Sequence, residues 1–315
     1  MRILITGAAG NLGSFLTYHL IPSNHDLQLL YHQTELPVTT KEHTNVSVYQ
    51  GDLAAPDSLH LACKDVDCIV HFAGVLFAPS PERFLSTTNV LFVKNLVSAA
   101  LDSQVKKIIL VSFPHVEGES TPDHPAAGKL EGQPTSVHAQ TRLAAEKHLF
   151  ESTTGTEITP VVLRSGMIYG RGVLMIEAAR WLLARRLLGV WRDPTWIHLL
   201  SLPDFLACTT AAIEGERISG IYNLGDEKPM LLQEFLDAFA KHCGYAAPWR
   251  APRWLFPLAG GFMELGVWLL KKPAPLTRDF IRIGMVSYTA NTDRMRKELL
   301  LELVYPNLAT GVELL

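Results

Sequence analysis

Cysteine is scarce in this 315-residue chain, and none of its four cysteines belongs to a CxxC pair. Cys63, Cys68, Cys208 and Cys243 are expected to be reduced core thiols, which argues against a disulfide framework and a cysteine-ligated metal. Histidines and carboxylates likewise show no metal-ligand spacing, so we expect no metal site. The N-terminus lacks the basic region and cleavage site of a secretory signal peptide, and the expected compartment is the cytoplasm.

Neither sign of charge dominates, and no apolar run is long enough to cross a membrane. The 28 Lys and Arg residues nearly balance the 31 Asp and Glu residues, so bulk charge does not favour a nucleic-acid partner. The longest apolar run, residues 254–270, is shorter than the roughly 20 residues of a membrane span. It could be a buried amphipathic helix, rim a pocket for an apolar substrate, or rest on a membrane surface. Basic residues flank it at Arg250, Arg253, Lys271 and Lys272.

Apolar residues make up 48% of the chain and charged residues 19%, which excludes a disordered protein. The first half alternates short β-branched runs with helical patterns, which predicts βαβ units and a parallel sheet. Strands are expected at residues 3–6, 27–31, 46–50, 68–72, 107–112 and 159–164. Helices are expected at residues 11–20, 57–63, 89–103 and 137–151. Residues 113–135, rich in proline and glycine, are expected to form an irregular ligand-binding loop.

The segment TGAAGNLG, residues 6–13, lies between the first predicted strand and the first predicted helix. Its three glycines allow a tight turn, a close approach of the backbone to a pyrophosphate, and close packing of the helix on the strand. The unpaired N–H groups and the positive dipole end of the helix attract a diphosphate. The residues predicted to bind a dinucleotide here are Gly7, Gly10, Asn11, Leu12 and Gly13.

The second predicted strand ends at Tyr31 without the Asp or Glu that reads the ribose 2′-hydroxyl in NAD-specific sites. Without that carboxylate a 2′-phosphate is not repelled, and His32 could donate a hydrogen bond to it. Alternatively, His32 is an exposed loop residue that does not bind the cofactor. The sequence therefore predicts NADP or NAD as the cofactor, with NADP slightly favoured.

Two further segments follow predicted strands and are expected to meet the cofactor at the same edge of the sheet. Asp52 and Leu53 follow the third strand, where the Asp52 carboxylate can accept a hydrogen bond from the adenine amino group. The alternative for Asp52 is a helix N-cap. Ala73 and Gly74 follow the fourth strand, and their small size would let the cofactor lie against the backbone.

Together these segments make the chain resemble the extended short-chain dehydrogenase/reductase superfamily, in its NAD-dependent epimerase/dehydratase group. The matching segments are TGAAGNLG (6–13), GDL (51–53), DCIVHFAG (67–74), Asn89-Val90, KKIILVS (106–112), LRSGMIYGRG (163–172), Pro203-Asp204 and YNLGDEKPMLLQEF (222–235). The resemblance implies an α/β fold, a Rossmann-type doubly wound parallel sheet with a smaller C-terminal substrate-binding lobe. We divide the chain into an NAD(P)-binding domain, residues 1–168, and a substrate-binding lobe, residues 169–315, parts of which return to the sheet.

The resemblance also implies a catalytic set, from which this chain departs. In the family a Ser or Thr and a Tyr-x-x-x-Lys pair handle the proton, and the Lys lowers the pKa of the Tyr and holds the nicotinamide ribose. The pair aligns with His138 and Arg142, and no tyrosine lies in residues 113–168. Phe113 takes the hydroxyl position, next to Ser112, whereas the family's helix asparagine is kept. The catalytic candidates are therefore His138, Arg142, Ser112 and Asn89.

Two functions follow from this altered site. Four-residue spacing puts His138 and Arg142 on one helix face, where the arginine would keep the imidazole neutral and could grip ribose hydroxyls. The first hypothesis is an NAD(P)-dependent oxidoreductase or epimerase that acts on a small carbonyl, alcohol or nucleotide-sugar substrate with His138 as acid/base. The alternative is a catalytically silent dinucleotide-binding redox sensor or structural subunit. His115, in the proline-rich loop, is a second acid/base candidate.

The second half of the chain gives less information about partners. Four arginines lie among tryptophans and could clamp a nucleotide-sugar diphosphate, or could simply cover a solvated helix. They are Arg180, Arg185, Arg186 and Arg192. We expect a small-molecule substrate, and the family resemblance adds the expectation of a homodimer.

Overall fold

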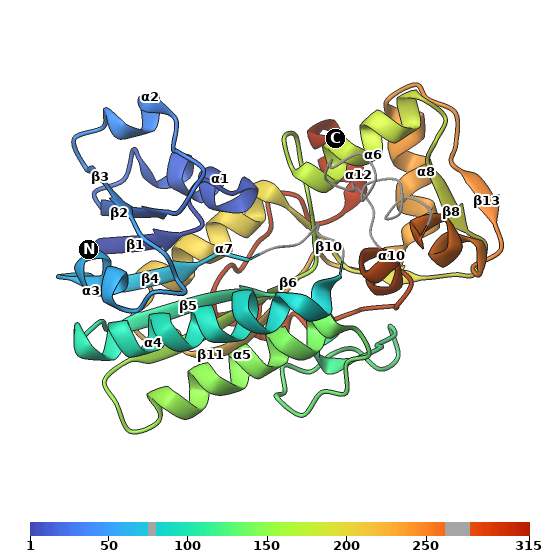
Figure 1. Cartoon of the computed structure of the whole chain (residues 1–315). Coiled ribbons are helices and arrows are strands. Elements are labelled where there is room, and N and C mark those ends of the chain that lie inside the picture. The colour runs from blue at the N-terminus through green and yellow to red at the C-terminus, as the bar shows by residue number, and fades with distance from the viewer. Residues whose placement is uncertain (75–79, 262–277) are drawn as a thin grey trace.

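The computed structural model describes residues 1–74, 80–261 and 278–315. Its centre is a seven-stranded parallel sheet in the order β11-β6-β5-β4-β1-β2-β3 (Figure 1). The strands are β1 (Arg2–Thr6), β2 (Asp26–Tyr31), β3 (Val46–Gln50), β4 (Cys68–His71), β5 (Lys107–Ser112), β6 (Thr159–Ser165) and β11 (Gly220–Leu224). The predicted doubly wound sheet is thus confirmed. Its strand order reverses between β1 and β4, which is where sheets of this kind bind ligands.

Helices cover both faces of the sheet because successive strand residues point to opposite sides. They are α1 (Asn11–Leu20), α3 (Asp57–Cys63), α4 (Phe92–Asp102), α5 (Val137–Thr153) and α7 (Leu202–Glu214). Ile3 and Ile5 of β1 join a core cluster with α1 and α7, whereas Leu4 joins a second cluster with α3, α4 and α5. Figure 1 shows α4 and α5 side by side along one face. The glycine-rich turn therefore starts from a strand that is packed on both faces.

Two short helices depart from the predicted pattern. Ser86–Leu91 (η2) is a π-helical turn that leads directly into α4, so the helix expected at residues 89–103 begins earlier than its apolar stripe indicates. Such turns are frequent at functional sites, and this one carries the wholly buried Asn89. The helix α2 (Val38–Lys41) has no signal in the sequence because VTTK is rich in β-branched residues.

The second half of the chain supplies β11 and α7 to the sheet and otherwise forms a smaller region with three two-stranded pairings. The elements are β7 (Met167–Tyr169), α6 (Leu174–Ala184), β8 (Gly189–Trp191), β9 (Trp196–Ile197), β10 (Leu199–Ser201), β12 (Met230–Leu231), α8 (Leu232–His242), β13 (Trp249–Ala251), α10 (Arg278–Gly284), α11 (Asp293–Glu298), α12 (Leu308–Gly311) and η4 (Val312–Leu314). Residues 255–261 are helical; residues 262–270 of the apolar run, with Lys271 and Lys272, lie outside the described residues. No helix in the described parts is long and apolar enough to cross a membrane.

The predicted irregular loop, residues 113–135, contains one short 3-10 turn, η3 (Pro114–Glu117), and is held by contacts with distant segments. The Ala126 N–H donates to the Thr289 carbonyl at 2.8 Å, and the Ala126 carbonyl accepts from the Asn223 side chain at 2.9 Å. The Ser120 hydroxyl donates to the Thr289 carbonyl at 2.9 Å. The loop is thereby fixed between the sheet edge and the C-terminal segment. A further short 3-10 turn, η1 (Pro81–Arg83), precedes η2.

Lys107 provides a stability prediction because its buried ammonium group closes the C-terminal end of α7. Its Nζ donates to the carbonyls of Ala212, Ile213 and Gly215 at 2.9, 3.3 and 2.6 Å. A Lys107→Met substitution removes a cation from the negative end of the helix dipole and takes a hydrogen-bond donor from these carbonyls, although that of Gly215 keeps the Ile218 N–H at 3.2 Å. We expect the free energy of unfolding, measured by urea denaturation, to fall by about 2–3 kcal/mol.

The neighbouring Lys106 is the matched control for this experiment. Its side chain is 79% exposed and its Nζ meets Asp67 only at 3.5 Å. Lys106→Met should therefore cost less than about 1 kcal/mol. Equal losses from the two substitutions would contradict the role given to Lys107.

Candidate active site

The glycine-rich turn between β1 and α1 brings three backbone segments into contact. Gly7 has a φ of +73°, and the Gly10 N–H donates to its carbonyl at 2.8 Å. A Cβ on Gly13 would lie 2.2 Å from the Gly7 carbonyl oxygen, and a Cβ on Gly7 would lie 2.8 Å from the Ala73 nitrogen. Glycine is required at both positions because no side chain fits between these segments.

The first turn of α1 keeps its backbone N–H groups available for an anion. Its N-cap, Gly10, is extended and supplies no side-chain cap. The Asn11 side chain is engaged elsewhere: Nδ2 donates to the Gly172 carbonyl at 2.8 Å, and Oδ1 accepts from the Leu174 N–H at 2.9 Å. Leu12 packs against the core. At Asn11 and Leu12 the backbone, rather than the side chain, is the part suited to a phosphate.

His32 and Asp52 meet at the adjacent ends of β2 and β3. The His32 Nε2 lies 3.7 Å from the Asp52 Oδ2, and the two side chains are 57% and 40% exposed. Asp52 Oδ1 accepts from the Ala54 N–H at 2.8 Å. The N-cap alternative for Asp52 is wrong, because α3 begins five residues later, after Pro56. Leu53 turns inward and is 8% exposed.

Arg142 reaches from α5 toward the backbone that follows β4. A Cβ on Gly74 would lie 3.2 Å from the Arg142 Nη2 and 3.6 Å from the Asn89 Oδ1, so both side chains border this glycine. Arg142 is only 7% exposed, and its Nε and Nη1 have no hydrogen-bond partner among the described residues. Burial lowers the pKa of Arg142 to about 10, against the opposing effect of Glu146, so it is a cation at neutral pH.

His138, one helical turn before Arg142, is held by Asn89. The Asn89 Nδ2 lies 3.3 Å from the His138 Nδ1 and 2.9 Å from the Thr141 hydroxyl. If the amide donates to Nδ1, the imidazole proton sits on Nε2. Burial, followed by Arg142 and His115, lowers the pKa of His138 to about 3. The ring is therefore neutral at pH 7, as expected, although burial contributes more than the arginine.

Polar atoms without partners gather at the carboxyl ends of the central strands. Besides Arg142, they include the Asn89 Oδ1 and the His71 Nε2, neither of which has a partner among the described residues. His71 belongs to the core at the end of β4, and its Nδ1 lies 2.7 Å from the Thr6 hydroxyl. Buried polar groups are normally paired, so this concentration indicates a ligand-binding region.

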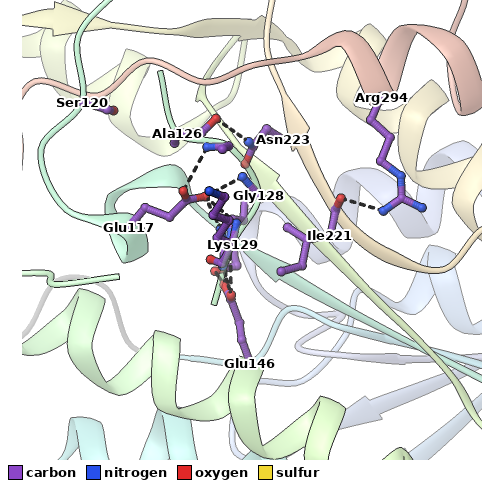
Figure 2. Close-up of polar contacts among 12 residues, drawn as sticks. Glu117, Ser120, Ala126, Gly128, Lys129, Glu146, Ile221, Asn223 and Arg294 are labelled. Carbon is purple, nitrogen blue, oxygen red and sulfur yellow. Dashed lines mark hydrogen bonds and ion pairs between the residues drawn. The ribbon is translucent and has the colours of Figure 1, made fainter. Parts of the chain in front are cut away.

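Ser112 is turned into a buried charge network. Its hydroxyl donates to Glu146, whose Oε2 lies 2.6 Å from the Arg164 Nη2. The Arg164 Nη1 lies 2.5 Å from the Glu117 Oε1, and Arg164 and Glu146 are wholly buried. Figure 2 shows Glu117 reaching the loop backbone, where it accepts N–H groups of residues 127–129 at 2.9, 2.7 and 3.1 Å. The Ser112 hydroxyl thus ties the end of β5 to α5.

Two imidazole rings contact Phe113. The Phe113 centroid lies 5.1 Å from that of His138 and 5.4 Å from that of His115. The His115 ring in turn contacts Tyr288 at 4.2 Å. Burial lowers the pKa of His115 to about 4, so it is also neutral at pH 7. Phe113 therefore covers one side of the His138 ring.

A cavity of about 270 Å³ opens at the N-terminal end of α5. Its lining is Thr135, Ser136, Val137, Arg253, Asp279, Arg282 and Met285. The sequence offered no signal for Arg282, because it comes from α10, far along the chain. Of the four arginines predicted to clamp a diphosphate, Arg192 lines a second cavity of about 650 Å³, together with Arg253 and Trp254.

The other predicted clamp residues have different contacts. Arg180 pairs with Glu177 at 3.4 Å and lies over the Phe239 ring, and Arg185 lies over the Trp181 ring.

Asp204 lies in the first turn of α7, whose N-cap is Ser201. No group of three or more metal-ligating side chains occurs among the residues that the structure describes.

Comparison with known proteins places this geometry in context. The model of the NAD dependent epimerase/dehydratase family matches residues 3–193. A uronate dehydrogenase of Pseudomonas syringae pv. tomato is 38% identical over 117 residues, which span 37% of this chain and 41% of that protein. A 2-alkyl-3-oxoalkanoate reductase of Stenotrophomonas maltophilia is 25% identical over 75% of this chain and 74% of its own length.

A solved structure is similar over the whole chain. The UDP-glucuronic acid 4-epimerase of Bacillus cereus, in complex with UDP-glucuronic acid and NAD, superimposes with a TM-score of 0.76 at 18% identity. The alignment covers 100% of this chain and 97% of that one. At this level of identity the likeness shows a shared fold.

Proposed function

The chain belongs to the NAD dependent epimerase/dehydratase family, and we propose that it is an NAD(P)-dependent oxidoreductase or epimerase with an altered catalytic pair. Residues 1–168 would hold the cofactor, and the lobe of residues 169–315 would hold the substrate. The turn at Gly7, Gly10 and Gly13 and the uncapped start of α1 fit a pyrophosphate. A bound nicotinamide group would supply or accept the hydride.

The observation that carries this proposal is the buried guanidinium of Arg142 beside Gly74, whose Nε and Nη1 have no hydrogen-bond partner among the described residues. A desolvated cation without a partner is costly, and a ligand that accepts its hydrogen bonds would offset the cost. The fork of N–H groups on an arginine suits a pair of ribose hydroxyls. Arg142 would thus take over the orienting part of the lysine that it replaces, without being able to give up a proton.

His138 would act mainly as a hydrogen-bond donor. With a pKa near 3 its ring is a weak base, so at neutral pH the Nε2–H can polarise a substrate carbonyl more readily than Nε2 can accept a proton. Asn89 would orient the ring through Nδ1, and Ser112 would act only through Glu146. His138 and Arg142 are therefore the proposed catalytic residues, whereas Asn89 and Ser112 are proposed to position them.

We propose a small carbonyl, alcohol or nucleotide-sugar substrate bound at the cavity beside the start of α5. The relatives named above act on a uronate, a 2-alkyl-3-oxoalkanoate and a UDP-glucuronic acid, which supports this class. For the cofactor we propose NADP or NAD, with NADP slightly favoured, because β2 ends in His32 rather than an acid. Asp52 lies close enough to His32 to oppose that preference by repelling a 2′-phosphate. A cytoplasmic location and a homodimer stay predictions.

The role of His138 can be tested by replacing it with phenylalanine. We expect His138→Phe to lower turnover about a hundredfold or more, because the donor is lost. Cofactor affinity should be nearly unchanged, because Arg142 and the glycine turn remain. Turnover would be followed by nicotinamide absorbance with uronates, 3-oxo compounds, alcohols and nucleotide sugars. The control is His60→Phe, on the exposed face of α3; equal activity in His138→Phe and this control would contradict the role.

The second candidate function is dinucleotide binding without turnover. It is favoured by one specific feature, the Phe113 ring that covers His138 where the family has a hydroxyl. This function predicts that a nicotinamide dinucleotide raises the unfolding temperature and that no substrate of the same panel is converted. Robust conversion of any one of them would rule it out.

A further inference from the structure

The exposed tryptophans gather on one part of the C-terminal region. Among the described residues Trp181, Trp249 and Trp254 are 51%, 49% and 64% exposed, and Leu187 and Leu258 near them are 56% and 54% exposed. These five residues form what we term the tryptophan patch. Single exposed apolar side chains are ordinary, but a group of this kind with aromatic members marks an interaction surface.

One hydrogen bond joins two members of the tryptophan patch, and a ring contact links one of them to the segment that carries Trp254 and Leu258. The Trp249 indole N–H donates to the Leu187 carbonyl at 3.4 Å, and the Trp249 ring stacks on Phe256 with centroids 5.6 Å apart. Phe256 belongs to the helical residues 255–261, and Trp254 and Leu258 lie on either side of it in sequence. The surface therefore runs from the end of α6, past the β8–β13 pairing, to that helical segment (Figure 1).

Several arginines lie around the tryptophan patch, although the whole chain carries a net charge of −3; one acid, Asp193, lines the larger cavity together with Trp254 and Arg253. Arg185, Arg186 and Arg253 are exposed and form no ion pair with any residue that the structure describes. By contrast, the nearby acids Glu177 and Asp237 are already paired, with Arg180 at 3.4 Å and Arg250 at 2.6 Å. The arginines that remain unpaired are available to an anionic partner.

We propose that the tryptophan patch docks the protein on the surface of a membrane that contains anionic phospholipids. Indole rings are amphipathic and prefer the headgroup level, and exposed arginines there gain from lipid phosphates. A second copy of the chain fits less well, because a two-fold contact would bring the same three arginines of both copies together. This binding is independent of the proposed redox function, although Arg253 also lines the cavity beside α5.

Vesicle flotation tests the proposal directly. The wild-type protein should float with phosphatidylcholine vesicles that contain phosphatidylglycerol, with a blue shift of tryptophan emission, and should bind pure phosphatidylcholine less well. Added salt should weaken the binding. The double variant Trp254→Ser/Leu258→Ser should lower the partition coefficient about tenfold or more, because two large apolar side chains are lost from the contact with the membrane.

Leu301→Ser/Val304→Ser is the matched control, since these side chains are 79% and 65% exposed outside the tryptophan patch. It should bind like the wild type, and all variants should keep the wild-type unfolding temperature. The proposal is overturned if the wild type does not bind anionic vesicles or if the control loses as much affinity. It is also overturned if sedimentation shows a dimer that the tryptophan-patch variant abolishes, which would assign this surface to a second copy.

Discussion

Replacing Arg164 by methionine is expected to lower the free energy of unfolding by about 3–5 kcal/mol, the largest loss that we predict for a single side chain. Arg164 is 0% exposed and joins Glu146 and Glu117 with ion-pair distances of 2.6 and 2.5 Å. Its Nη2 also donates to the Lys129 carbonyl at 2.8 Å. Methionine fills similar space but leaves two carboxylates, one of them wholly buried, without their cation.

Urea denaturation is the measurement, and Arg2→Met is the control. Arg2 also pairs with an acid, Asp65, at 3.6 Å, but its side chain is 41% exposed. Its loss should cost about 1 kcal/mol or less from the ion pair. Adding Glu146→Gln to Arg164→Met should recover part of the stability, because one unpaired charge disappears. Similar losses for the two arginines would mean that the buried network does not stabilise the protein as described.

Asp226→Asn is expected to stabilise the protein at alkaline pH. Asp226 is 2% exposed, and burial raises its pKa to about 8, against the opposing effect of Arg296. Burial lowers the pKa of its neighbour His198 to about 4, and the His198 Nε2 lies 3.0 Å from the Asp226 carbonyl oxygen. At neutral pH the two side chains therefore form a neutral contact, although their 3.5 Å separation resembles an ion pair.

The sign of the pH effect follows from the raised pKa. The folded protein keeps a proton that the unfolded chain releases near pH 4, so stability declines as the pH rises from about 4 to about 8. Asparagine does not titrate and lacks this decline. At pH 8 the variant should exceed the wild type by about 2 kcal/mol or more, and this advantage should shrink toward about pH 4. The exposed Asp193→Asn is the control, and a pH-independent difference for Asp226→Asn would contradict the assignment.

The fold could be predicted because its signals are local. Apolar runs and turn residues marked six of the seven strands of the sheet, all but β11, and the glycine spacing of residues 6–13 indicated the first turn. The π-helical turn at Ser86–Leu91 could not be predicted, because its sequence continues the helical pattern of α4. The π-helical turn differs from α4 in its hydrogen-bonding pattern, and it places the Asn89 side chain toward α5. No local sequence pattern encodes this difference.

The site was only partly predictable for a similar reason. The positions of His138 and Arg142 follow from helical spacing, but the unpaired guanidinium depends on which groups surround it in space. The same limit explains Ser112, whose hydroxyl is taken by Glu146 from another element. Arg253 and Arg282, which line the cavity beside α5, come from segments more than a hundred residues away in the chain. Sequence spacing therefore indicates which residues share an element but not which tertiary partners they meet.

The most direct test of the account is a calorimetric titration of the wild type and Arg142→Met with NADP and NAD, oxidised and reduced. We predict saturable binding of at least one form to the wild type and affinity about tenfold or more lower for Arg142→Met, because charge-assisted hydrogen bonds are lost. The unbound variant should be at least as stable as the wild type, since a buried unpaired charge is removed. Absence of binding to the wild type, or equal affinity in the variant, would contradict the central claim that Arg142 holds a nicotinamide dinucleotide.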